Sequence, residues 1–207
     1  MRKVLIAMVA CLFVLGISAT ANAVVLIPNT SVATTGASVP AGTFVTSVTT
    51  AFAASSGAWS GSVTENVYLN ATGYLFVYQW SNDPGSLDAI ARMTASNYTG
   101  FLTDADAVAT GLQDEPHFMS RSAGGNSIGF AHSQGTTDQG VLPGTTTAQE
   151  WIQTNAQYYG PGFVDFIDGG VAEIKLFGPA VPEPASASLL GLGLLGFVGA
   201  LRRKFMA

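Results

Sequence analysis

The sequence predicts an all-β domain, an antiparallel β-sandwich of jelly-roll-like form, between an N-terminal signal peptide and one C-terminal transmembrane helix. Three observations point to the all-β class. The central stretch is rich in Ser, Thr, Gly, Asn and Ala but has few Lys and Glu residues, which surface helices need on their exposed faces. Several segments alternate apolar and polar residues with a period of two. Turns containing Gly and Pro separate these segments at short intervals.

Two neighbouring segments form the clearest predicted hairpin. Residues 62–69 place Val63, Val67 and Leu69 on one face, with mostly polar residues opposite. Residues 74–80 are apolar on both faces, as expected of a central strand that is covered on each side. The intervening residues 70–73 are Asn, Ala, Thr and Gly, which favour a turn. We therefore expect the two segments to pair.

Four further segments are predicted to be strands. They are residues 44–52, 127–131, 150–157 and 172–176. Residues 87–93 fit a helix or a strand, because periodicity does not decide for short apolar runs. No internal repeat is detected, and we predict one extracellular domain over residues 24–178.

The N-terminus has the three parts of a secretory signal peptide. Two cations precede a short apolar stretch, which ends in the small-residue sequence Ala21-Asn22-Ala23. The apolar stretch is short for a membrane anchor, so an uncleaved span is disfavoured. We expect cleavage after Ala23, which removes residues 1–23 and leaves Val24 as the first residue of the mature chain.

The sole cysteine, Cys11, lies inside this apolar stretch. The residues before it faintly resemble a lipoprotein processing site. Too few residues precede it for a normal signal, however, and the apolar run continues beyond it. The mature protein is therefore expected to contain no cysteine, which excludes disulfide bonds and thiolate metal sites.

A Pro-rich linker, residues 179–184, follows the predicted domain and contains the motif Pro182-Glu183-Pro184. Proline fixes its own backbone angle and has no amide hydrogen to donate. The stretch from Pro182 to Pro184 is therefore not expected to join a sheet or to continue a helix. We identify Pro182, Glu183 and Pro184 as the candidate sorting site.

The linker leads into an uncharged segment and then into a basic one. Residues 185–201 carry no charge, and as a helix they would extend about 25 Å, just short of the ~30 Å hydrocarbon layer. The terminal residues 202–207 include Arg202, Arg203 and Lys204, which should stay cytoplasmic by the positive-inside rule. The cations at the N-terminus also begin inside. The domain between the two segments is therefore predicted to lie outside the membrane.

This ending resembles the PEP-CTERM sorting signal, which combines a Pro-Glu-Pro motif, a short transmembrane stretch and an Arg-rich terminus. The resemblance covers residues 181–207. It implies transient anchoring in the inner membrane and cleavage near the motif by a membrane protease of the exosortase type. It also implies delivery to the surface or extracellular matrix of a Gram-negative bacterium, often one that produces exopolysaccharide. The alternative is an ordinary C-terminal anchor behind a Pro-rich spacer.

The central stretch also resembles the β-rich passenger domains that often precede PEP-CTERM tails. Residues 61–80, 90–92, 142–144 and 153–156 carry this similarity. Such passenger domains share no general activity. This second resemblance therefore implies a fold class and not a biochemical function.

The charge balance excludes one class of partner. Residues 24–181 contain three cations and twelve anions, a net charge of −9 with histidines neutral. Such a charge repels phosphate backbones, so we expect no nucleic-acid binding. It suits an extracellular protein, and acidic loops of this kind attract divalent cations.

The strongest candidate for catalysis is the segment from Ala131 to Gly135, whose sequence AHSQG is close to the G-x-S-x-G elbow of α/β-hydrolases. That elbow must lead into a helix, but the following residues include another glycine. The triad order also requires a histidine after the serine and the acid, and none follows His132. We predict that Ser133 lies in a surface turn and that the chain has no catalytic residue.

Two candidate metal sites are also weak. Asp114, Glu115, His117 and His132 can be grouped, but no spacing fixes two of them on one element. The sequence from Asp104 begins like a calcium loop but lacks its third oxygen ligand and its glycine. We therefore predict no cofactor and no defined metal site. Calcium held by acidic loops stays open as an alternative, without an assigned set of ligands.

The aromatic residues leave a choice between the core and the surface. Trp59, Trp80, Trp151 and the pair Tyr158-Tyr159 would stack on sugar rings if exposed, although core positions are favoured. The leading interpretation is a noncatalytic exported protein of the cell surface or matrix, associated with exopolysaccharide or biofilm. The alternative is a carbohydrate-binding module that recognises a specific glycan through a tryptophan platform, and an enzyme is the third choice.

Overall fold

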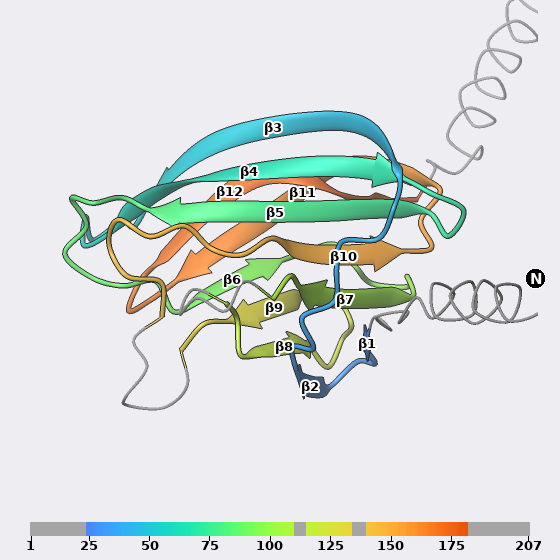
Figure 1. The fold of residues 1–207 in the computed structure, drawn as a ribbon, viewed down its shortest axis with the longest axis horizontal. Helices are drawn as coiled ribbons and strands as arrows, with labels where there is room; N and C mark the ends of the chain where they lie inside the picture. The colour runs from blue at the N-terminus through green and yellow to red at the C-terminus, as the bar shows by residue number, and fades with distance from the viewer. Residues whose placement is uncertain (1–23, 110–114, 134–139, 182–207) are drawn as a thin grey trace, which may run out of the picture.

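A computed structural model of the chain describes residues 24–109, 115–133 and 140–181. These residues form two six-stranded antiparallel sheets and contain no helix, which confirms the predicted all-β class (Figure 1). The predicted signal peptide and the predicted membrane segment lie outside them. Within the described ranges, no helix is long and apolar enough to cross a membrane.

Each sheet draws strands from the whole length of the domain. Sheet A has the order β1-β7-β10-β5-β4-β3, with β1 Val24–Val25, β7 Thr103–Ala107, β10 Glu150–Thr154, β5 Tyr74–Asn82, β4 Ser60–Leu69 and β3 Thr43–Ala53. Sheet B has the order β12-β11-β6-β9-β8-β2, with β12 Val171–Ala180, β11 Tyr158–Ile167, β6 Arg92–Ala95, β9 Ile128–Ala131, β8 Phe118–Arg121 and β2 Thr30–Ala33. The chain alternates between the sheets from β5 to β8, as in a jelly roll, whereas β3, β4 and β5 form a meander within one sheet.

The two sheets lie in separate layers and share one hydrophobic core (Figure 1). Phe52 of β3 stacks on Phe166 of β11, with ring centroids 3.7 Å apart and ring planes 11° apart. Trp80 of β5 meets Phe166 edge-on at 5.2 Å. Because side chains from both sheets meet in this way, their packing is that of two sandwich layers.

The predicted hairpin is confirmed. β4 pairs with β5 along its length, and Asn70 closes the turn by donating its amide hydrogen to the Gly73 carbonyl at 3.1 Å. The ambiguous segment 87–93 is mostly irregular: Ile90 makes an isolated bridge to Val141, and β6 begins at Arg92. The strand predicted over residues 150–157 is shorter and ends at Thr154.

The segment between β2 and β3, residues 34–42, crosses the outer face of sheet A (Figure 1). We call it the strap. The Asp106 carboxylate of β7 accepts hydrogen bonds from the amide and the hydroxyl of Thr35. Trp151 of β10 donates its indole hydrogen to the Ala37 carbonyl at 3.0 Å. Leu75 and Val77 of β5 are buried in the apolar cluster that includes Ala37, which explains why β5 is apolar on both faces.

The loops gather at two opposite ends of the domain. The tail end is the one at which β12 finishes. There Tyr74 donates its amide hydrogen to the Ala156 carbonyl, and the Tyr74 ring packs on Tyr159 at 5.0 Å. The far end is the one with the β11–β12 turn, where the Trp59 indole donates to the Asp168 carbonyl at 3.0 Å.

Arg121 ties together several tail-end loops. Its buried guanidinium donates to the carbonyls of Leu26, Tyr98, Phe101 and Gly125, at 2.8 to 3.1 Å. It also donates to the Thr103 hydroxyl at 2.8 Å. Carbonyl oxygens thus stabilise this buried cation, and no described carboxylate pairs with it.

Candidate functional site

The sequence similar to a hydrolase elbow begins at the end of β9. Ala131 is the last residue of that strand, and the described residues of the motif are Ala131, His132 and half-buried Ser133. His132 is fully buried, and its backbone amide donates to the Ala91 carbonyl at 2.8 Å. The remaining two positions, 134 and 135, lie outside the described residues.

His132 instead belongs to a buried polar cluster between the sheets. Its Nε2 lies 2.7 Å from Oε1 of Glu150 on β10, and both side chains are completely buried. The Trp80 indole donates to the same carboxylate oxygen at 3.1 Å, and its ring meets the His132 ring edge-on. Nδ1 of His132 and Oε2 of Glu150 have no hydrogen-bond partner among the described residues. The cluster links sheets A and B, and its reactive atoms do not reach solvent.

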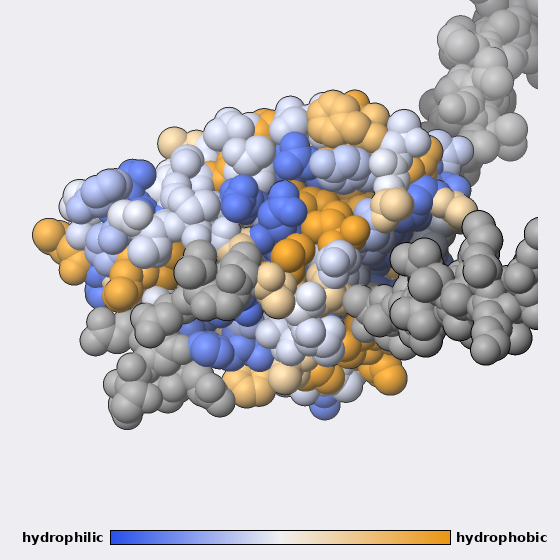
Figure 2. Space-filling view, viewed as in Figure 1, coloured by the Kyte–Doolittle hydropathy of each residue, from blue (hydrophilic) through white to orange (hydrophobic). Residues whose placement is uncertain are grey.

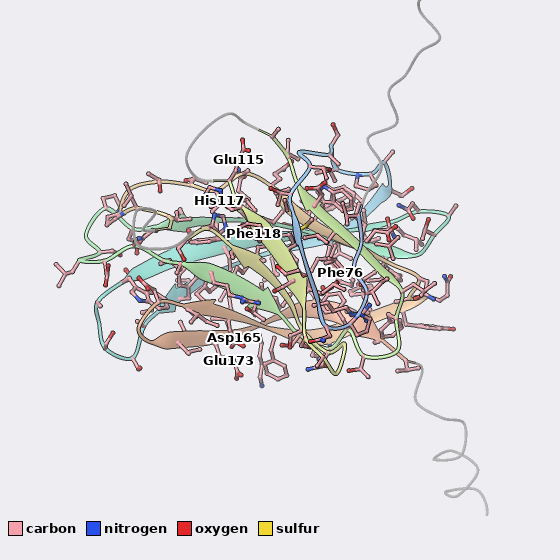
Figure 3. All side chains as sticks on the ribbon, turned by 90° about the horizontal axis from the view of Figure 1, so that it is seen from below. Phe76, Glu115, His117, Phe118, Asp165 and Glu173 are labelled. Carbon is pink, nitrogen blue, oxygen red and sulfur yellow. The ribbon has the colours of Figure 1, made fainter. Side chains whose placement is uncertain are left out.

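The residues grouped as a metal-site candidate do not converge. Figure 3 shows Glu115 and His117 together just before β8. His132 is engaged with Glu150, and Asp114 lies outside the described residues. Within the described ranges, no three His, Cys, Asp or Glu side chains are grouped to hold a metal ion.

The segment that begins like a calcium loop is a strand. Asp104 and Asp106 both belong to β7, so they are not presented by a loop around one point. Burial raises the pKa of the half-buried Asp104 carboxyl. Asp106 is fully buried and holds the strap. Asp106 therefore holds the strap in place and is not a calcium ligand in this arrangement, because its carboxylate accepts hydrogen bonds from the strap.

All three tryptophans are in the interior. Trp59, Trp80 and Trp151 are each 1% exposed, which agrees with the favoured core interpretation and excludes a tryptophan platform. Each indole hydrogen has a protein acceptor. Tyr158 is 55% exposed, whereas Tyr159 is half-buried between Tyr74 and Phe177. In the part of the chain that the structure describes, the glycan alternative therefore lacks the tryptophan platform on which it depends.

A buried carboxyl on β4 is the residue that sequence reasoning missed. Glu65 lies on the inner face of sheet A with Val63 and Val67, and it is 0% exposed. Its Oε2 accepts a 2.7 Å hydrogen bond from the backbone amide of Phe177 on β12. The alternation of this segment could have predicted the burial of Glu65. Side chains two residues apart in a strand lie on the same face, so residue 65 shares the face of residues 63 and 67.

The interior makes Glu65 a weak acid. Burial raises the pKa of Glu65 to about 8, although the Phe177 amide and the Tyr78 hydroxyl act in the opposite direction by stabilising its anion. Tyr78 lies opposite Glu65 in the β4–β5 register, and its hydroxyl is 3.2 Å from that of Tyr98. Burial also raises the pKa of both tyrosines. The sandwich thus contains a neutral acid–phenol cluster at neutral pH.

The clearest functional feature begins where the fold ends. Ala180 is the last residue of β12 and pairs with Tyr158 of β11, and Val181 beyond it is 77% exposed. Residues 180–204 match the PEP-CTERM protein-sorting motif. No curated protein and no solved structure matches the chain.

The match confirms the predicted resemblance to the PEP-CTERM signal. It covers Pro182, Glu183 and Pro184 together with the basic residues Arg202, Arg203 and Lys204, all outside the described residues. Such a signal implies processing by an exosortase and a surface or extracellular location. The β-rich domain that precedes it is the passenger.

Proposed function

We propose that this chain is a noncatalytic exported protein of the cell surface or extracellular matrix. Residues 185–201 hold it in the inner membrane until an exosortase-type protease cuts near Pro182-Glu183-Pro184. The observation that carries the proposal is the sorting motif, which begins at Ala180, the last residue of the last strand. Cleavage beyond this point leaves both sheets complete, so the passenger stays folded after release.

The linker suits a protease substrate for physical reasons. Proteases bind extended chains, and Pro182 and Pro184 keep the chain out of both sheet and helix. Glu183 supplies the one charged group between the domain and the predicted span. We infer that this carboxylate is read by the protease and is not needed for folding.

A fractionation experiment in the native host tests this role. Glu183→Gln keeps the size of the side chain but removes its charge. We expect the wild-type protein outside the cell at the processed size and the variant in the membrane at full length. The matched control is Glu173→Gln, a change at an exposed position on β12 that should be processed like the wild type. Appearance of the Glu183 variant outside at the processed size would show that the linker is a mere spacer.

We also propose that the released domain resides in an exopolysaccharide matrix. Its net charge of −9 and its many Ser, Thr and Asn residues favour hydration over compact self-association. The expected result is that enzymatic digestion of the matrix polysaccharide releases the domain from washed cells. Retention of the domain on digested cells would point instead to a protein receptor at the surface.

A further inference from the structure

Charged residues are divided unequally between the two ends of the domain. The tail-end loops contain no Asp, Glu, Lys, Arg or His; they are residues 26–29, 70–73, 96–102, 122–127 and 155–157. The far end is acidic, with Asp83, Asp88, Glu115 and Asp168 in its loops. Burial and the nearby charge of Asp88 raise the pKa of Asp168. The far end therefore concentrates negative charge, and the tail-end loops have none.

The tail end also exposes a set of large apolar and aromatic side chains. We call it the apolar fringe, and its members are Ile27 (62% exposed), Phe44 (56%), Leu69 (39%), Leu102 (71%), Tyr158 (55%) and Val181 (77%). Figure 2 shows hydrophobic atoms at the lower right, over β1, together with further groups in the middle and at the left of this face. The far end exposes fewer large apolar side chains, namely Leu87 (87%), Val171 (50%) and Leu142 (44%). The loop of Leu87 also carries Asp83 and Asp88.

The register shows that fringe residues from distant parts of the sequence belong to the same end. Leu69 is the last residue of β4 and pairs with Thr43, the residue before Phe44. Tyr158 opens β11 opposite Ala180, next to Val181. The Leu102 amide donates to the Asn155 side chain, and the Leu26 amide donates to the Thr103 carbonyl. The fringe thus surrounds the point at which the chain leaves the fold.

The distance from this exit to the predicted membrane segment is short. Only residues 181–184 separate Ala180 from the apolar run that begins at residue 185. Four extended residues reach at most about 14 Å. β12 has ten residues, so it extends about 33 Å. The linker is therefore too short to let the domain turn over, and the tail end must stay near the headgroup layer.

We propose that, before processing, the tail end rests on the outer surface of the phospholipid bilayer that holds the tail. This inference depends on the membrane anchoring in the proposed function. Apolar and aromatic side chains are stabilised at the headgroup level, and the uncharged loops bring no ionised group there. Anionic lipids repel the acidic far end, which therefore points away from the membrane.

This orientation has a consequence for processing. The Pro-Glu-Pro motif is held between the folded domain and the bilayer, at the depth that a membrane-embedded protease reaches. After cleavage the domain that carries the apolar fringe is no longer attached to the membrane segment. A small uncharged patch without an anchor holds a protein on a bilayer only weakly, so the domain departs.

The test uses the precursor that has lost residues 1–23 and keeps its C-terminal tail, purified from cells that lack the sorting protease and reconstituted into phosphatidylcholine–phosphatidylglycerol vesicles. Cys11 is the only native cysteine and lies in the predicted signal peptide, so single-cysteine variants carry one fluorescent label. Leu102→Cys labels the tail end, and Leu87→Cys is the matched control at the far end; both positions are strongly exposed. Lipids with a spin-labelled headgroup serve as the quencher.

We expect several-fold stronger quenching of the label at position 102 than at position 87. A second arm adds Ile27→Asp and Tyr158→Asp to the Leu102→Cys protein, and this double change should reduce the quenching, whereas Leu142→Asp should leave it unchanged. Equal quenching at positions 102 and 87 in protein that floats with vesicles overturns the orientation and leaves the anchoring intact. Protein that does not float with vesicles overturns the anchoring itself.

Discussion

The Glu65 carboxyl and the Phe177 backbone amide form a 2.7 Å hydrogen bond that joins the two sheets. Phe177 belongs to β12, which is an edge strand of sheet B and has a neighbouring strand on one side only. Glu65 projects from β4 of sheet A and provides the acceptor that a second neighbouring strand would otherwise supply. Edge strands that are satisfied in this way are less open to pairing with other chains.

This placement predicts that the domain loses stability as the pH rises. The pKa of Glu65 is raised from its ordinary value of 4.5 to about 8, so the folded state holds a proton that the unfolded state releases. The stabilisation that the bound proton on Glu65 gives to the folded state is full below about pH 4.5 and is lost as the pH rises through about 8. At pH 7 the loss amounts to about 3 kcal/mol. Urea unfolding of the passenger domain between pH 4 and pH 9 measures this slope.

Glu65→Gln isolates the contribution of this one group. The amide keeps an acceptor for the Phe177 amide hydrogen and does not titrate. We expect the variant to match the wild type near pH 4 and to exceed its unfolding free energy at pH 8. The exposed Glu173→Gln change on β12 is the control; it relieves the repulsion that helps to raise the pKa of Asp165, and it should preserve the wild-type slope near pH 8. A wild-type slope in the Glu65 variant would assign the pH dependence to other groups.

A second prediction concerns the buried pair of His132 and Glu150. His132→Phe leaves the Glu150 carboxylate with the Trp80 indole as its remaining described donor. We expect a loss of about 1 to 3 kcal/mol in the free energy of unfolding, because a buried polar group then lacks its hydrogen-bond partner. The double change His132→Phe with Glu150→Leu should restore part of the loss, since it removes both polar groups. Urea unfolding of both variants checks this, and additive losses would contradict the pairing.

Local patterning predicted the strands whose two faces differ clearly, and it failed where distant segments change the environment. Alternation identified β4, in which Val63 and Val67 repeat with a period of two, and a run of apolar residues on both faces identified β5. It did not identify β7, since Asp106 faces outward and is buried by the strap, which lies about 70 residues earlier in the chain.

The strand β11 was also missed, for a different reason. Gly160, Pro161 and Gly162 are typical of a turn. In the structure they pair with β12 on one side only, because β6 begins its pairing with β11 at Val164. Proline is tolerated where no ladder hydrogen bond is required. The partners of Glu65 and His132, at sequence separations of 112 and 18, are likewise set by sheet packing and not by local pattern.

A third prediction concerns Arg121. Its guanidinium donates to four carbonyls and the Thr103 hydroxyl, so Arg121→Met leaves several buried acceptors without donors. We expect a loss of about 3 kcal/mol or more in unfolding free energy. Arg92→Met is the matched control, because Arg92 is half-buried and its hydrogen bonds to described residues go to the Thr94 and Ser120 hydroxyls. Thermal and urea unfolding compare the two, and equal losses would rule out a special role for Arg121.

The last prediction concerns the basic end of the tail. Arg202, Arg203 and Lys204 follow the predicted span, and cations at this position keep the end of the segment on the cytoplasmic side. The span is short and contains several glycines, so its hydrophobicity alone retains it weakly. We expect that replacement of all three cations by Gln releases uncut, full-length protein outside the cell. The same replacement in the Glu183→Gln variant should remove the form that is trapped in the membrane. Immunoblots of membrane and external fractions distinguish the two sizes. Continued retention of the triple variant at full length would show that the apolar run is a sufficient anchor.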